Sequence, residues 1–585
     1  MTVATQGAEK TPILIVGGGP TGLLASLLLS RLQIDHILIE RRQAPQPAPA
    51  AHVVNTRTME ILRAAGLDTN EFYALDRHSD AQFISWVSSP RDKAIGKLSL
   101  QGDLDSAEDL RRFTGRAAAS PEHITNISQN LFEEALLSRA LSMDHQDIRL
   151  GHSWQGFVND DTHRVRVMDP DGATYEVTAD YVLAADGASS GIARTLGVAK
   201  SGPKSLATFL NLSCEVDLSQ SVAEQQSLLY WCLSPETPGI LIVHDPKSLT
   251  VYMRPVFEPY ETAADYSDER CEALVKEIFG SDVPVRITYK GVWNMSAQVA
   301  DKFSVDNVFL VGDAAHRFPP TGGLGLNSGA GDIHNLVWKL AAVLKHNAPS
   351  YLLSSYEAER KPVAERNCAT SVNNFLKMKE VTDTLGLDAD KAHLPAMLRA
   401  SPFVRWLPST SIDWLLKLLS RPALRKLKTA MSDTSAGEVQ RKQTQKAINN
   451  QAEHFDMLGA ELGYIYSEGC AVDPSSSATP TSTTRDYTPT SGAGARLPHI
   501  SLEENGTIKS SLDLVSYDGF RLFTNGTASN PPNTSWTQGL PCQTVNLEDF
   551  NNHTTAAAAF DLEPGSWILV RPDGHVATRS TPSPT

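Results

Sequence analysis

One segment near the middle of the chain constrains its fold most. A short apolar run, NVFLVG (307–312), leads into Asp313, a Pro-Pro pair, several glycines and an amphipathic helical pattern up to residue 341. The run is bounded by glycine and is typical of a buried strand. Glycines let the backbone approach a flat ligand closely, and a helix N-terminus offers free N–H groups to an anion. The segment therefore predicts a strand, a turn and a helix that hold a planar ring, with Asp313 on a polyol chain.

A second ligand-binding pattern lies close to the N-terminus. An apolar run at 12–16 enters a G-x-G-x-x-G loop, and a helical pattern, a second apolar run at 36–39 and Glu40 follow. Bare G-x-G-x-x-G matches occur in ordinary turns, but here every part of the nucleotide-binding unit follows in order. The loop suits a pyrophosphate and Glu40 suits ribose hydroxyls. The loop glycines expected at the phosphates are Gly17, Gly19 and Gly22. Together the two segments describe the two ends of FAD.

A third pattern joins them into a family resemblance. The apolar run 181–185 ends in Asp186-Gly187, between the two segments already described. In this order the pieces resemble the group A flavoprotein monooxygenases of the p-hydroxybenzoate hydroxylase fold, and most closely their phenol hydroxylase and 2,4-dichlorophenol monooxygenase branch. The segments that carry the branch resemblance are AHVVNTRTMEIL (51–62), HRFPPTGGLGLN (316–327), SYEAERKPVAERN (355–367), RLPHISL (496–502) and LVRPDGHVATR (569–579).

The resemblance implies an α/β fold with a Rossmann-like FAD-binding domain, a β-sheet substrate domain, a helical region and a C-terminal thioredoxin-like domain. Length alone suggests two to four domains. Apolar runs at 206–212, 228–233, 239–244 and 249–255 predict strands of the substrate sheet. The expected ranges are 10–200 plus 290–395 for FAD, 201–289 for the substrate sheet, 396–470 for the helical region, 471–484 for a Pro/Ser/Thr-rich linker and 485–585 for the last domain.

For the cofactor, the resemblance implies specific contacts. Gly312 and Asp313 would meet the ribityl chain, with an N-cap role as the alternative for the aspartate. Gly325 would allow close approach, and the backbone N–H groups of Leu326 and Asn327 would face the flavin N1/C2=O edge. We expect FAD to be bound noncovalently. Gln129 would contact the flavin, and Arg41 would bind the cofactor beside the ribose acid Glu40. An exposed surface position is the alternative for each of these two side chains.

The resemblance also implies that Asp186 braces the pyrophosphate region and takes part in NADPH or NADH binding. This chain departs from the family pattern nearby. The usual arginine after the motif is Ala193, followed by Arg194, and Ala50 replaces an arginine that commonly reaches the pyrophosphate. Both departures weaken the transfer of the nicotinamide contacts to this chain.

Candidate substrate residues rest on alignment with phenol hydroxylases. His52 takes the place of an aspartate base, and a histidine can accept a phenolic proton near neutral pH. Tyr252 and His244 align with pocket residues that orient a phenolic oxygen, and Pro320 with the following glycines would shape the oxygen-transfer pocket. Structural core or surface roles are the alternatives for these side chains.

The predicted function is an FAD-dependent, NAD(P)H-consuming monooxygenase that hydroxylates a small phenolic or other aromatic substrate with O2 through a flavin C4a-hydroperoxide. One rival is epoxidation or Baeyer–Villiger insertion on a polyketide- or terpenoid-like substrate. Another is a non-catalytic relative that uses the fold as a binding scaffold. The lone Cys542 in the last domain excludes dithiol chemistry there, because thioredoxin chemistry needs a pair. That domain is expected to be structural, at the interface of a homodimer if one forms.

Bulk properties exclude other classes. The net charge is −15, from 67 acidic and 52 basic residues, which argues against nucleic acid or an anionic membrane as a partner. The six cysteines are widely separated and predict reduced, mostly buried thiols with no metal site. The polar N-terminus has no apolar signal region, and no apolar run predicts a membrane span. These features predict a cytoplasmic protein.

Overall fold

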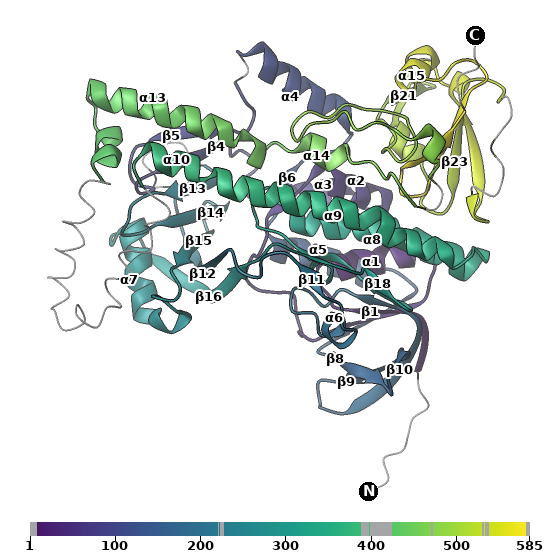
Figure 1. Cartoon of the computed structure of the whole chain (residues 1–585), viewed down its shortest axis with the longest axis horizontal. Coiled ribbons are helices and arrows are strands. Elements are labelled where there is room, and N and C mark those ends of the chain that lie inside the picture. Colours follow the sequence, from purple (N-terminus) through teal and green to yellow (C-terminus); the bar gives the residue numbers. More distant parts are fainter. Residues whose placement is uncertain are drawn as a thin grey trace, which may run out of the picture.

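The computed structural model describes residues 9–580, with gaps at 104, 220–221, 223–226, 388–396, 398–423, 470–471, 529–531 and 533–536. Of the helical region expected at 396–470, residues 396, 398–423 and 470 therefore lie outside the described residues. We keep the expected roles as labels for the parts of the structure, namely the cofactor domain, the substrate sheet and the C-terminal domain. Figure 1 shows the substrate sheet and α7 (Asp268–Phe279) at one side and the C-terminal domain at the opposite upper corner. The cofactor domain lies between and below them.

The cofactor domain is built on one large sheet. Its main path runs β18-β19-β10-β1-β2-β7, with β8 and β9 joined at β10. The pairs β1–β2, β1–β10 and β10–β19 are parallel, so their carboxyl ends meet at one edge. The strands predicted at 12–16, 36–39, 181–185 and 307–312 are confirmed, and each ends within two residues of its predicted carboxyl end. The bounds are β1 Glu9–Val16, β2 His36–Glu40, β7 Gln146–Leu150, β8 Ser153–Val158, β9 Asp161–Met168, β10 Thr174–Ala184, β18 Ser304–Val305 and β19 Val308–Leu310.

Helices α1, α5, α8 and α9 cover this sheet, and α1 packs against both α5 and α8. Figure 1 shows α8 and α9 running side by side across the molecule. The expectation that α8 is amphipathic is wrong, because every residue from Asn327 to Ala342 is buried. The helix has neighbours on all sides, and several of its polar side chains pair with α9, as Asp332 does with Arg360 and Lys339 with Glu359. The helix bounds are α1 Pro20–Arg31, α2 Thr56–Ala64, α3 Thr69–Tyr73, α4 Ala107–Ala119, α5 Gln129–Leu141, α6 Gly191–Thr195, α8 Leu324–His346, α9 Tyr351–Lys377, α10 Lys379–Thr384, α13 Ser435–Asn449 and α14 Leu458–Leu462.

The substrate sheet has the order β16-β12-β15-β14-β13-β4-β5. The four strands predicted from the apolar runs are confirmed. The sheet also takes β4 and β5 from residues 83–99, and its last strand reaches residue 295. One face packs on α7, and the other packs partly on α10 and α13. Its bounds are β4 Phe83–Val87, β5 Gly96–Ser99, β12 Ala207–Val216, β13 Leu229–Cys232, β14 Gly239–Asp245, β15 Leu249–Val256 and β16 Val285–Met295.

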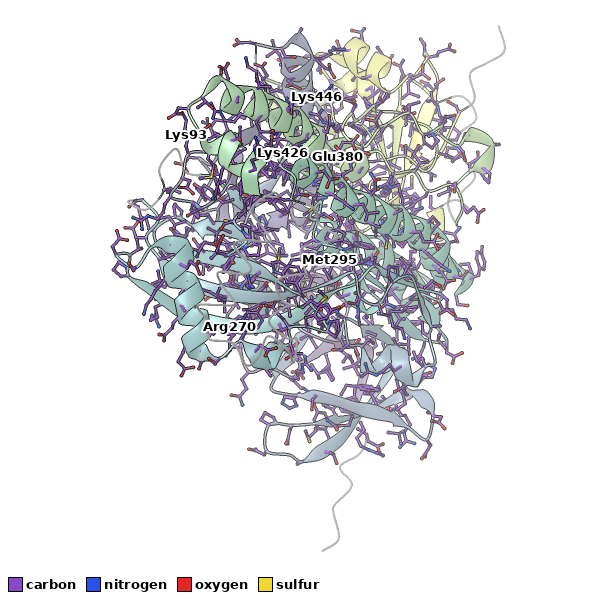
Figure 2. All side chains as sticks on the ribbon, turned by 60° about the vertical axis from the view of Figure 1, so that its left-hand side comes forward. Lys93, Arg270, Met295, Glu380, Lys426 and Lys446 are labelled. Atoms are coloured by element: carbon purple, nitrogen blue, oxygen red, sulfur yellow. The ribbon has the colours of Figure 1, made fainter. Side chains whose placement is uncertain are left out.

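Two small sheets join the cofactor and substrate domains. One has the order β11-β17-β20, with bounds Lys200–Ser201, Gln298–Ala300 and His316–Arg317. The other pairs β3 (Val53–Val54) with β6 (Thr125–Asn126). In Figure 2 Met295 lies near the centre of the molecule, whereas Arg270 on α7 lies at its periphery.

The C-terminal domain contains a four-stranded sheet of order β24-β23-β25-β26. Its linker also makes contacts, since Ser477 forms a β-bridge with Ala493. In the described part of the chain, we find no helix that combines the length and apolar character needed to cross a membrane. The bounds are β21 Ser501–Glu504, β22 Thr507–Ser510, β23 Phe520–Thr524, β24 Cys542–Asn546, α15 His553–Ala559, β25 Trp567–Val570 and β26 Val576–Arg579.

Candidate active site

The glycines near the sheet edge divide into two groups. A Cβ on Gly17, whose φ is +114°, would collide with the carbonyl oxygen of Ala185, and one on Gly22 would collide with the Gly17 carbonyl. These two glycines are required by the protein's own packing. A Cβ on Gly19 or Gly325 would meet no atom within 4 Å. These two positions therefore border open space, where a ligand can approach the backbone.

Glu40 lies against the glycine loop, as expected for an acid at this strand end. The Gly18 N–H donates to Glu40 Oε2 at 2.7 Å, and Arg42 Nε donates to Oε1 at 3.0 Å. Arg41 is exposed, so Arg42 is the arginine that reaches the acid. Sequence reasoning missed Arg42, although residues two apart on an extended backbone share a face.

The turn after β19 holds Asp313 in an open position. Its side chain is exposed and accepts no hydrogen bond from any residue the structure describes. The preceding Gly312 N–H donates to Asp332 Oδ2 at 3.1 Å, and this oxygen lies 2.7 Å from His316 Nε2. Arg360 Nε donates to the other oxygen of Asp332 at 2.8 Å. This buried network fixes the turn and leaves the Asp313 carboxylate free to accept hydrogen bonds from a polyol.

Burial alone would raise the pKa of Asp332, but the neighbouring His316 and Arg360 hold it below its usual value. Asp332 is therefore an anion that anchors the turn. Neither it nor Arg360 was selected as a site residue from the sequence, although Arg360 lies within the segment 355–367 that carries the family resemblance.

The N-terminus of α8 presents free backbone N–H groups. The helix begins at Leu324 with Gly323 as its N-cap, so the N–H groups of Gly325 and Leu326 have no partner within the helix. Leu326 is better placed than Asn327 to face the flavin, because Asn327 is the fourth residue and helix geometry directs its N–H along the ladder. The Asn327 side chain accepts from Asn55 N at 3.0 Å and donates to the Val53 carbonyl at 3.0 Å. Asn327 thus joins α8 to the segment that carries His52.

His52 and His244 meet between the cofactor domain and the substrate sheet. Their ring centroids lie 5.6 Å apart, with planes at 86°. His52 Nδ1 lies 3.1 Å from Asn126 Oδ1 on β6. Burial lowers the pKa of His52, and burial followed by His52 lowers that of His244 well below 6.5. Two neutral imidazoles therefore face each other one residue from Val53, which lies against Gly323 at the α8 N-terminus.

Tyr252 is not part of this site. It is buried in the apolar cluster beneath α7, and its hydroxyl donates to the Pro238 carbonyl at 3.0 Å. It pairs with Leu241 across the strands, whereas the ladder is irregular between Val243 and Asp245, where His244 contacts His52. These contacts correspond to the core role that was the alternative for Tyr252.

The remaining predicted residues lie near the cofactor edge. Gln129 begins α5 and its amide donates to Glu133 Oε1 at 2.7 Å. Pro320 is exposed in the turn before α8, and its carbonyl accepts from Gly323 N at 3.0 Å. Asp186 lies beside Gly17, and its Oδ2 accepts from Ile192 N at 3.2 Å.

Comparison with known families decides what this edge binds. Residues 10–371 match the FAD binding domain family, and residues 490–585 match the aromatic-ring hydroxylase C-terminal family. This chain is an FAD-dependent aromatic-ring hydroxylase. It is 31% identical to a putative polyketide hydroxylase of Streptomyces halstedii, covering 99% of this chain and 94% of the relative. It is 28% identical to the 2,4-dichlorophenol 6-monooxygenase of Cupriavidus pinatubonensis, covering 98% and 94%.

Solved structures agree with this assignment. The flavin-dependent monooxygenase PieE, in complex with FAD and substrate, superposes with a TM-score of 0.83 at 27% identity, over 99% of this chain and 96% of PieE. A ternary complex of aklavinone-11 hydroxylase with FAD and aklavinone gives 0.73 at 25% identity, over 98% and 96%. The predicted α/β fold, with its p-hydroxybenzoate hydroxylase architecture, is confirmed.

The residues of this hydroxylase fit FAD on structural grounds. Gly19 and Gly325 leave room for the dinucleotide, Asp313 offers a free carboxylate, and the α8 N-terminus offers free N–H groups beside the histidines. Such N–H groups favour a ring that becomes negative on reduction.

Proposed function

We propose that this hydroxylase transfers one oxygen atom of O2 to a phenolic substrate, with NADH or NADPH as the reductant. The observation that carries the proposal is the His52–His244 pair, 5.6 Å between centroids, beside the free N–H groups of α8. Bound and reduced, FAD would supply an electrophilic oxygen at this place. The chain's own residues hold and ionise the substrate.

His52 suits the role of general base. With Nδ1 directed at the Asn126 amide oxygen, the ring proton lies on Nδ1 and the Nε2 lone pair is available. Asp76 supports this arrangement, since its Oδ2 accepts from Asn126 N at 3.0 Å. A neutral imidazole can take the proton of a phenol, whose pKa is about 10, and the phenolate is the more reactive ring. His244 would hold the phenolic oxygen from the substrate sheet.

The substrate class we favour is a planar phenol with several fused rings. The sheet face opposite α7 carries stacked aromatic pairs, Trp86–Trp231 with centroids 6.3 Å apart and Phe209–Trp293 at 5.4 Å. Aromatic surfaces suit flat aromatic ligands. The polyketide hydroxylase relative supports a multi-ring substrate, and the dichlorophenol relative supports a phenol. Epoxidation or Baeyer–Villiger insertion on a polyketide-like substrate is the rival reaction.

The test is a screen of monocyclic and fused-ring phenols for stimulated NADH or NADPH oxidation, with products analysed by mass and NMR. We expect a product with one added oxygen atom as a ring hydroxyl. An epoxide or a ring-expanded lactone would favour the rival reaction, and no oxidation with any aromatic compound would contradict the proposal.

A further inference from the structure

A group of cations lies next to the predicted cofactor edge, and among the described residues none of these cations forms an ion pair with the nearby acids Asp186 and Asp313. Lys200 on β11 and Arg317 on β20 flank the central strand β17 of the small three-stranded sheet. Ser201 and His316 both pair with Val299 on β17, so these three side chains share one face of the sheet. Lys200 and Arg317 are the chain neighbours of Ser201 and His316. By the alternation of side chains along each strand, Lys200 and Arg317 project from one face of this sheet.

Arg317 has no partner of its own. It is half-buried, and among the residues the structure describes its guanidinium makes no hydrogen bond or ion pair. Its Nε is fully enclosed and still lacks an acceptor. Buried arginine donors are normally paired, because removing them from water without a partner costs free energy. An unpaired guanidinium group at this position therefore indicates that a bound ligand supplies the hydrogen-bond acceptor.

Neighbouring charges add to the effect. Within the described part of the chain, Lys200 Nζ donates only to the Asp313 carbonyl, at 3.3 Å, and Arg194 Nη1 donates to the Ser189 carbonyl at 2.7 Å. Burial first, and then Arg317, lower the pKa of Lys200 to about 8, and Arg194 acts in the same direction. The three cations are thus close enough to repel one another. An anion between them would relieve that repulsion.

The nearby acids do not supply this anion. Asp186 and Asp313 lie within electrostatic range of Lys200, but neither forms an ion pair with it. Asp186 Oδ1 is itself buried without a partner. Asp186 adjoins Gly17, which places the group of cations at the phosphate end of the cofactor edge.

We propose that Lys200, Arg317 and Arg194 bind the diphosphate of a dinucleotide. Arginine forms bidentate hydrogen bonds to phosphate, and lysine adds a point charge. The site would supply the charge that this chain lacks at Ala50 and Ala193. Two dinucleotides carry this group, FAD and NAD(P)H. Assignment of the site to NAD(P)H rests on the proposed function, whereas assignment of the site to FAD does not.

The test uses the full chain and the variants Arg317→Met, Lys200→Met and the double variant, which remove charge and keep side-chain length. Arg286→Met is the matched control, since Arg286 pairs with Glu215 on the exposed surface of the substrate sheet. The dissociation constant of FAD is measured on the apoprotein by quenching of flavin fluorescence. Binding of NADP+ and NAD+ to the FAD-loaded protein is measured by calorimetry.

We expect the double variant to weaken one dinucleotide about tenfold or more, since each lost hydrogen bond to a charged group is worth roughly that factor. Arg317→Lys should recover part of the loss. Weaker FAD binding assigns the site to FAD, and unchanged FAD with weaker NADP+ or NAD+ assigns it to the nicotinamide nucleotide. Unchanged binding of both in the double variant would overturn the proposal.

Failure of the proposed function gives a different result. In that case wild-type flavin is reduced by neither NADH nor NADPH, while the FAD and NADP+ titrations still decide the site. Melting of the apoprotein separates misfolding from lost binding, and we expect Arg317→Met to melt no lower than wild type, because it removes an unpaired charge.

Discussion

Lys339 on α8 donates to Glu359 on α9 at 2.8 Å, and neither side chain has any exposed surface. Arg571 of the C-terminal domain donates to both oxygens of the same glutamate, at 2.9 and 2.8 Å. One buried carboxylate thus joins two helices of the cofactor domain to the C-terminal domain. Burial nevertheless lowers the pKa of Lys339 to about 8.

Replacement of Glu359 by alanine should destabilise the protein strongly. It leaves Lys339 and Arg571 as buried cations that share only the Asp573 carboxylate, which costs about 3–5 kcal/mol. The melting temperature should fall, and limited proteolysis should release the C-terminal domain first. The control is Glu504→Ala, which removes an exposed partner of Lys509 and costs at most about 1 kcal/mol. Equal melting temperatures for the two variants would contradict this account.

Gly325→Val should impair cofactor binding without impairing the fold. A Cβ at this helical position meets nothing within 4 Å of the protein's own atoms, so the apoprotein should melt like wild type. FAD affinity and activity should fall, because the side chain enters the space we assign to the flavin. Gly22→Ala is the contrasting variant, since its Cβ collides with the Gly17 carbonyl and should lower the melting temperature itself. Normal FAD affinity in Gly325→Val would refute the placement.

Asp313→Ala should lose most of the bound flavin and keep its folded stability. The carboxylate is exposed and accepts no hydrogen bond from any described residue, so the fold does not depend on it. The ratio of flavin to protein absorbance in the purified variant measures occupancy, and apoprotein melting serves as the control. Full occupancy would mean that Asp313 does not hold the ribityl chain.

His52→Ala should slow hydroxylation of weakly acidic phenols by about 10²–10⁴ and leave the flavin spectrum intact. NAD(P)H oxidation should become uncoupled from product, with peroxide released. The pKa of His52 lies below 6.5, so the base is neutral and active at neutral pH and is lost as pH falls through that pKa. The hydroxylation rate of the wild-type enzyme should therefore fall at low pH, and this fall should be absent in the variant.

The defect in His52→Ala should shrink for phenols of lower pKa, since they ionise without a base. A matched control is His145→Asn, at an exposed position whose left-handed backbone tolerates asparagine. A coupled and fast His52→Ala enzyme on weakly acidic phenols would leave this histidine with a structural role alone.

Glu461→Gln should make stability less dependent on pH. Burial raises the pKa of Glu461 to about 7, and its Oε2 accepts from Thr56 N at 3.2 Å. Since the folded pKa exceeds the unfolded value near 4.5, the group costs stability progressively as pH rises from about 4.5 through 7. The cost is at most about 3 kcal/mol. The melting temperature of the variant should match that of wild type at pH 5 and exceed it at pH 8. The same difference in melting temperature at both pH values would contradict this prediction.

The sequence by itself determined the elements that local patterns encode. Short apolar runs predicted four strands of each large sheet, because a buried strand needs little beyond its own side chains to be recognised. The order of G-x-G-x-x-G, Asp186 and Asp313 predicted the FAD edge, since parallel strands bring their carboxyl ends together.

Only the tertiary structure decided which residues meet across domains. Tyr252 is buried in the apolar cluster beneath α7, whereas His244 contacts His52 of the cofactor domain, and only the packing of the two domains decides this difference. Arg317 is unpaired, and Glu359 joins three segments, because of how elements far apart in sequence pack together. The periodicity of a local sequence segment does not predict such contacts. Each contact depends on the free energy of burying charges from separate segments in one place.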